Sequence, residues 1–137
     1  MAHTIRRVEY FHTTVHDRPG EALRFLTALA DLGVNLVAFT VIPSGLHETQ
    51  LTVFPSETPS FTDQSERVGF AIEGPHQALL VQGEDAPGAL VEIHERLFDA
   101  GINVHAATGV SGGDGRFGYI LQVRPSDFER AAAVLGV

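Results

Sequence analysis

The sequence contains an internal repeat, in which residues 85–108 copy residues 17–40 at an offset of 85 − 17 = 68 positions. Nine of the 24 aligned positions are identical, where average composition would give roughly one or two. The identical pairs are Asp17/Asp85, Pro19/Pro87, Gly20/Gly88, Leu29/Leu97, Asp31/Asp99, Gly33/Gly101, Asn35/Asn103, Ala38/Ala106 and Thr40/Thr108. Because a copied block of this length is one supersecondary unit, we expect two copies of a single α/β unit.

Hydrophobic periodicity and turn residues predict the same order of elements in both copies. Strands are expected at 8–15, 34–42, 50–54 and 70–72, and helices at 19–32 and 60–67, in the first copy. The second copy is expected to have strands at 78–82, 102–110 and 117–123, and helices at 87–100 and 127–135. The order βαββαβ predicts an α+β fold of two ferredoxin-like repeats, with Phe25, Phe39 and Phe98 in the cores.

The turn at Gly74-Pro75 separates the copies and predicts domains at 1–73 and 74–137. The second copy ends where its last strand should begin, so this copy is expected to lack that strand or to have it supplied from elsewhere. In this topology the missing strand would flank 78–82, and an uncovered edge there needs a partner. We expect the cover to come from the first copy, by strand exchange within the chain, or from a second chain in a homodimer.

Composition excludes several classes of protein. The 17 acidic and nine basic side chains give a net charge of −8, which repels nucleic acid and anionic membranes. The absence of cysteine excludes disulfides and thiolate catalysis, and the absence of lysine excludes Schiff-base chemistry. No run of about 18 apolar residues is present, so we expect a cytoplasmic protein without a membrane span.

The segments Asp17-Arg18-Pro19-Gly20 and Asp85-Ala86-Pro87-Gly88 are candidate ligand sites. The first N–H groups of a helix attract a carboxylate, and glycine lets a ligand approach the backbone. The aspartates could hold an ammonium group, so that each turn would bind a free amino acid. Asn35 and Asn103 offer donors and an acceptor nearby. The alternative is structural: aspartate caps the helix that follows, and asparagine completes the end of a helix.

The two copies resemble the ACT domain, because Asp-x-Pro-Gly is followed by Gly-Val-Asn or Gly-Ile-Asn with a strand on either side. ACT domains are βαββαβ regulatory modules that bind amino acids and are attached to enzymes such as aspartokinase. The resemblance implies a stand-alone, allosteric amino-acid sensor, or a subunit acting on a partner enzyme. It also implies sites between modules, which would pair the 17–20 turn with Asn103 and the 85–88 turn with Asn35. Serine-binding members have a histidine at the positions of Val15 and Gly83, which this chain lacks.

Other chemistries find no support in the spacing of residues. His12 and His16 would lie about 13 Å apart on a strand, too far for one ion, and His47, His76, His94 and His105 have no ligand-like spacing. Ser111 lies in a glycine-rich turn without an evident base. We therefore expect no catalytic residues, no metal and no cofactor. The alternatives are a dimerisation module that binds no ligand and, less favoured, a small metal-dependent glyoxalase-like enzyme.

Overall fold

The computed structural model describes residues 3–137. The elements, in chain order, are β1 (His3–His16), α1 (Glu21–Asp31), β2 (Leu36–Pro43), β3 (Glu48–Pro55), α2 (Thr58–Gln64), the 3-10 helix η1 (Ser65–Val68), β4 (Glu73–Glu84), α3 (Val91–Asp99), β5 (Ala106–Ser111), β6 (Arg116–Gln122), the 3-10 helix η2 (Pro125–Asp127) and α4 (Phe128–Val134). The strand order is β2-β3-β1-β4-β6-β5. The fold is α+β, as the repeat predicts. None of the helices described is long and apolar enough to cross a membrane.

The chain forms two compact units, and β1 and β4 contribute to both. The first unit is Glu9–His76, and the second combines the beginning of β1, up to Val8, with Gln77–Val137. The divisions therefore fall inside these two strands. The turn expected at Gly74-Pro75 is instead part of β4.

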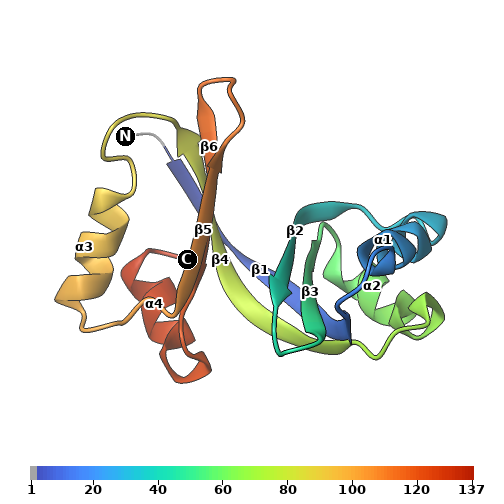
Figure 1. The fold of residues 1–137 in the computed structure, drawn as a ribbon. Coiled ribbons are helices and arrows are strands. Elements are labelled where there is room, and N and C mark those ends of the chain that lie inside the picture. Colours follow the sequence, from blue (N-terminus) through green and yellow to red (C-terminus); the bar gives the residue numbers. More distant parts are fainter. Residues whose placement is uncertain (1–2) are drawn as a thin grey trace. The chain divides into compact units, whose positions relative to one another are not determined.

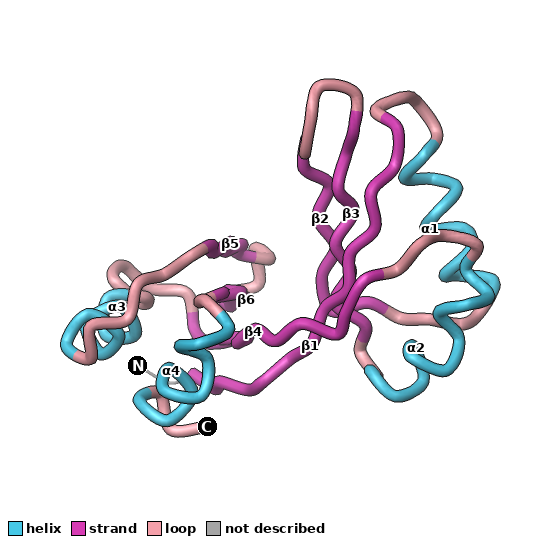
Figure 2. The backbone as a smooth tube through the Cα atoms, turned by 90° about the horizontal axis from the view of Figure 1, so that it is seen from below, coloured by secondary structure: helices cyan, strands magenta, loops and turns pink. Residues whose placement is uncertain are grey.

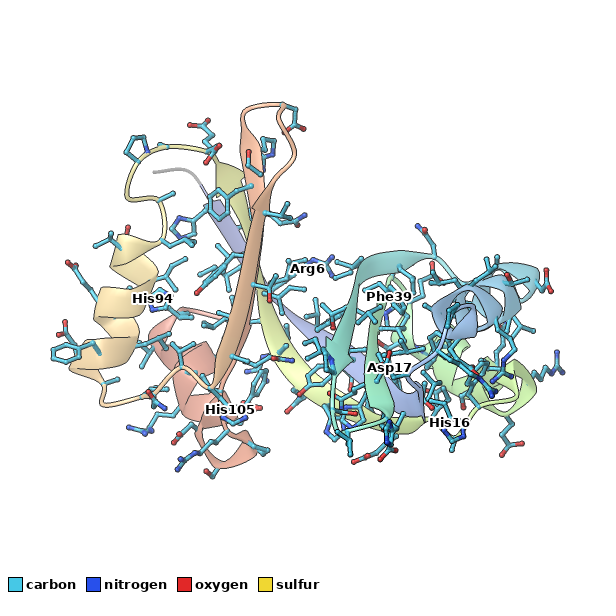
Figure 3. The ribbon with its side chains drawn as sticks, viewed as in Figure 1. Arg6, His16, Asp17, Phe39, His94 and His105 are labelled. Atoms are coloured by element: carbon cyan, nitrogen blue, oxygen red, sulfur yellow. The ribbon has the colours of Figure 1, made fainter. Side chains whose placement is uncertain are left out.

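In the first unit, α1 and α2 lie together on one face of the strands (Figure 1). β3 pairs antiparallel with β1 and with β2. The buried core between the sheet and the helices consists of Phe11, Val15, Phe25, Leu29, Leu51, Val53, Phe61 and Val68. Phe39 of β2, labelled in Figure 3, is half-buried against this core and stacks with Phe25 at 6.2 Å between ring centroids. Two of the three predicted core phenylalanines are therefore packed as expected.

In the second unit, α3 and α4 cover one face of β4, β6 and β5 (Figure 1), and β6 pairs antiparallel with both neighbours. Ile93 and Leu97 of α3 are fully buried against this sheet. Phe98 is 81% exposed, so its prediction as a core residue is wrong. Each helical residue is rotated by about 100° from the one before it, so a helix that buries Leu97 turns Phe98 towards solvent.

The first half of β1 supplies the strand that the second copy lacks. β1 and β4 are neighbours and lie side by side in Figure 2. Thr4 Oγ1 donates to the carbonyl of Gln82 at 3.5 Å, while His12 bonds Glu73, so the two strands run in opposite directions. Ile5 packs against the core of the second unit. Of the two covers expected for the edge at 78–82, strand exchange within the chain is the one found.

Several element boundaries differ from those predicted. The strand expected at 70–72 begins only at Glu73. Helix α1 begins at Glu21, because Gly20 takes a left-handed backbone conformation, with φ = 93°, that ends the turn before the helix. Helix α3 begins later still, at Val91, after a turn that contains Gly88 at φ = 77°. Pro19 and Pro87 thus precede the helices rather than open them.

Candidate ligand site

The two Asp-x-Pro-Gly turns are anchored in the same way, each within its own unit. The backbone N–H of Asp17 donates to the carbonyl of His47 at 2.8 Å, and that of Asp85 donates to Gly115 at 2.8 Å. Both the donors and the acceptors are related by the offset of 68, since 115 − 47 = 68. Each turn therefore lies beside the hairpin loop of its own copy, as Figure 3 shows for Asp17 just beyond the end of β1.

The aspartates do not cap the helices. Gly20 is the residue that precedes α1 and Leu90 the one that precedes α3, and neither helix has a side-chain cap hydrogen bond. The structural alternative for Asp17 and Asp85 is therefore wrong. The first N–H groups of a helix have no partner within the helix, but at the second turn the N–H of Val91, the first of α3, already donates to the carbonyl of Gly88 at 3.0 Å.

The first turn borders a cavity of about 340 Å³ that is lined by charged residues. Arg18 and Arg24 both bond the carboxylate of Glu21, at 2.7 and 2.9 Å. The Glu21 side chain is only 7% exposed, and hydrogen bonds from Arg24 and then Arg18 lower the pKa of its carboxyl group. The Arg24 guanidinium also lies over the ring of Phe70, 4.4 Å from its centroid.

The three side chains of Arg18, Glu21 and Arg24 carry a net charge of +1 by themselves, and the carboxylate of Glu48 lines the same cavity. Two guanidinium groups surround one carboxylate, and the side chains of Arg18 and Arg24 are 65% and 61% exposed. Each guanidinium has five N–H donors in a planar fork. Arg18 and Arg24 each donate one hydrogen bond to Glu21, through Nε and Nη2 respectively. The remaining donors suit a carboxylate, which guanidinium groups bind in a bidentate geometry.

The second turn borders a cavity of about 400 Å³ with a more apolar wall. Leu90, Val91, Val110 and Phe117 line it, together with Ala86, Gly88, Ala89, Gly109, Ser111 and Asp85. Ser111 Oγ donates to Asp85 Oδ2 at 2.9 Å, which orients the carboxylate. Among the described residues, the other oxygen of this carboxylate has no hydrogen bond. The cavity can therefore accept a cationic group next to an apolar one.

The two cavities differ because the repeat diverges at the positions that line them. At the offset of 68, Arg18 corresponds to Ala86, Glu21 to Ala89, Arg24 to Glu92 and Pro43 to Ser111. The backbone frame of the turn is thus shared, whereas the side chains beside it are not. The two copies therefore present different chemistry to a ligand.

The structure gathers only some of the site residues expected from sequence. Arg18 lines the first cavity, whereas Asp17, Pro19 and Gly20 lie outside its lining. In the second turn, Asp85, Ala86 and Gly88 line the cavity and Pro87 does not.

Neither asparagine lines the cavity at the turn of its own unit. Asn35 is exposed beside a separate hollow of about 260 Å³, and its carbonyl accepts from the N–H of Ser56 at 2.9 Å and from Ser56 Oγ at 3.2 Å. Asn103 is also exposed, and it lines neither turn cavity. The strand starts are therefore separate from the turns within each unit.

Sequence reasoning missed Glu21, Arg24 and Phe70 in the first cavity. A signal for Glu21 and Arg24 was present, because they are three residues apart in the predicted helix, and side chains three apart meet on a helix. Phe70 is 46 positions from Arg24, and no local pattern indicates that the two side chains stack.

Residues 13–61, within the first repeat, match the family model of the ACT domain. Among solved structures, the fold is similar to that of protein BT0572 from Bacteroides thetaiotaomicron, with a TM-score of 0.78, 16% identity, and coverage of 96% of this chain and 88% of that one. The fold is also similar to the regulatory subunits of aspartate kinase from Thermus thermophilus and Thermus flavus. Their TM-scores are 0.61 and 0.57, with 14% and 17% identity, 98% coverage of this chain and 94% of each subunit. No curated protein matches the sequence.

The tandem arrangement of ACT-type units is therefore the fold that this chain shares with aspartate kinase regulatory subunits.

Proposed function

We propose that the protein is a non-catalytic regulatory protein of the cytoplasm that binds a free amino acid at its Asp-x-Pro-Gly turns. The observation that carries the proposal is that each turn borders a cavity, of about 340 and 400 Å³. Small-molecule sites occupy about 300–1,000 Å³, so both cavities are at the lower end of this range, as a ligand of amino-acid size requires. The similarity to regulatory subunits supports a regulatory role.

The lining residues suggest how such a ligand would be held. In the first cavity, the unused donors of Arg18 and Arg24 would bind the ligand's carboxylate. In the second, the free oxygen of Asp85 would accept from the ammonium group, and Val110 and Phe117 would contact an apolar side chain. Asp17 was predicted to hold an ammonium in the first turn. It lies at the edge of that site and would act through long-range attraction.

Regulation would follow from linkage. A ligand that binds one arrangement of the protein more tightly than another shifts the population towards the first. The chain would transmit this shift to an enzyme in another polypeptide, as a homodimer or as a subunit of a larger complex.

The test is calorimetric titration of amino acids into matched variants. Asp85→Ala and Arg18→Ala should each weaken binding at one turn, and Asp17→Ala combined with Asp85→Ala should weaken binding sharply while the protein stays folded. Asp31→Ala combined with Asp99→Ala is the control, because these repeated aspartates are exposed at the far ends of α1 and α3. Equal binding by the turn variants and the control would show that the turns are not the site.

A second candidate function is assembly without a small ligand. The two end strands of the sheet, β2 and β5, expose apolar side chains: Val41 is 50%, Ile42 52% and Val110 71% exposed. Unpaired strand edges with apolar side chains favour association with another chain. This function predicts tight self-association that does not respond to any amino acid, which analytical ultracentrifugation with and without ligand would measure.

A further inference from the structure

Two histidines and a glutamate, far apart in the sequence, meet in the first unit. His12 lies on β1, and Glu73 and His76 lie on the neighbouring strand β4. His12 Nε2 is 2.9 Å from Glu73 Oε2, and His76 Nε2 is 3.6 Å from Glu73 Oε1. The ligand atoms of all three side chains lie within 4.8 Å of one another.

We propose that His12, Glu73 and His76 form a binding site for a divalent transition-metal ion. This site is separate from the turn cavities, since none of the three residues lines them. The spacing of histidines along the chain gave no sign of it, because the strand pairing brings together residues 61 and 64 positions apart.

The hydrogen bonds of the cluster are incomplete without an ion. The Glu73 carboxylate only accepts, so His12 Nε2 must donate to it. His76 Nε2 is buried, is too far from Glu73 for a hydrogen bond, and has no other hydrogen-bond partner among the described residues. A buried polar atom without a partner costs free energy, and a metal bond to this nitrogen would remove that cost.

The geometry is close to what an ion requires. Zinc–ligand bonds of about 2.0–2.1 Å in a tetrahedron place neighbouring ligand atoms about 3.3 Å apart. The two nitrogen–oxygen distances, 2.9 Å to Oε2 and 3.6 Å to Oε1, lie on either side of this value but involve different oxygens of Glu73, so the carboxylate would turn to bring one oxygen between the two imidazoles. The Glu73 side chain is 72% exposed and can adjust, while the two imidazole rings are stacked 4.8 Å apart and restrict each other.

The ligand set selects the class of metal. Imidazole nitrogen favours zinc, copper, nickel and cobalt over calcium and magnesium, which prefer oxygen ligands only. Two neutral imidazoles and one carboxylate leave a bound Zn²⁺ with a net charge of +1. Three protein ligands also leave a fourth position for water or for a group from another molecule.

The experiment is titration of Zn²⁺ into the chelator-treated full chain, with the melting temperature measured in parallel. We expect one Zn²⁺ per chain and a higher melting temperature, since an ion that binds only the folded state stabilises it. His12→Ala and His76→Ala should each weaken binding by at least about tenfold, because even outer-shell changes at metal sites cost about 10–100-fold. Glu73→Gln keeps the shape of the side chain and should also weaken binding.

His47→Ala is the matched control, because His47 is exposed in the turn between β2 and β3, outside the cluster. It should bind Zn²⁺ as the parent does. The visible absorption of bound Co²⁺ provides a second readout that depends on direct coordination and disappears in His12→Ala. Absence of stoichiometric binding by the parent, or equal loss in His47→Ala, would overturn the proposal and leave the cluster as an ion pair.

Discussion

Replacing Arg7 tests whether the beginning of β1 holds the second unit together. The Arg7 guanidinium bonds Glu129 at 2.7 Å and the carbonyl of Val137 at 3.2 Å, and it lies 5.6 Å from the ring centroid of Phe128. An exposed ion pair contributes about 0.2–1 kcal/mol, a hydrogen bond about 0.5–1.5 and an exposed cation–π contact about 0.5–1. Since these overlap in one side chain, we expect Arg7→Ala to cost about 1–3 kcal/mol.

Arg6→Ala is the matched control, because Arg6 (Figure 3) is the adjacent arginine, is exposed, and makes no ion pair, hydrogen bond or cation–π contact with the described residues. Its replacement should change the stability by less than about 0.5 kcal/mol. For a unit of this size, 1 kcal/mol shifts the melting midpoint by about 4–8 °C. Calorimetry should therefore separate the two variants clearly.

Hydrogen exchange should locate the effect. Arg7→Ala should raise amide exchange in β6 and α4 and leave α1 and β3 unchanged, because local stability follows the unit that loses its contacts. Equal melting midpoints for the Arg6 and Arg7 variants, or faster amide exchange confined to the first unit, would refute the claim that the beginning of β1 stabilises the second unit.

Three further predictions concern packing and pH. Phe25→Ala should cost about 3–5 kcal/mol because Phe25 is fully buried, whereas Phe98→Ala should change stability by less than about 0.5 kcal/mol; urea unfolding measures both. Because the pKa of Glu21 is lower in the folded protein than in the unfolded chain, stability should be retained above the unfolded pKa and lost as pH falls through the folded one. Glu21→Gln should flatten this acid limb of the stability curve. Burial raises the pKa of Tyr119, which is hydrogen-bonded to His94 at 2.7 Å, so stability should fall as pH rises above the ordinary tyrosine pKa of about 10, and phenolate absorbance should report the same shift.

The fold could be predicted from the sequence because the 68-residue offset of the repeat shows which positions of the two copies are equivalent. Leu29 and Leu97 occupy the same position of the two copies, and both are buried, as a copied helix face requires. Gly33 and Gly101 take left-handed conformations after both helices, with φ of 72° and 70°. The prediction that Phe98 is a core residue was wrong because it rested on residue type, and phenylalanine is usually buried. The rotation of α3 about its own axis decides which of its side chains face the sheet, and Phe98 is not one of them.

The sites were less accessible to sequence reasoning, since they depend on contacts between distant segments. Asp85 could be identified as a cavity residue from its turn, but its contact with Ser111 required the hairpin to be placed. His12 and His76 meet only because β1 and β4 are both long and pair along their length. Spacing rules for metal ligands describe ligands within a single helix or loop. They cannot predict a site whose ligands come from two paired strands that are far apart in the sequence.

The most direct test of amino-acid binding is thermal unfolding of the full chain against each of the twenty amino acids at millimolar excess and fixed protein concentration. A ligand at about 100 times its dissociation constant adds about 2.7 kcal/mol, which raises the midpoint by several degrees. We expect a selective rise for one chemical group of amino acids, reduced in Asp85→Ala and kept in the variant that combines Asp31→Ala with Asp99→Ala. A flat response to all twenty would contradict amino-acid sensing and favour assembly through the exposed end strands.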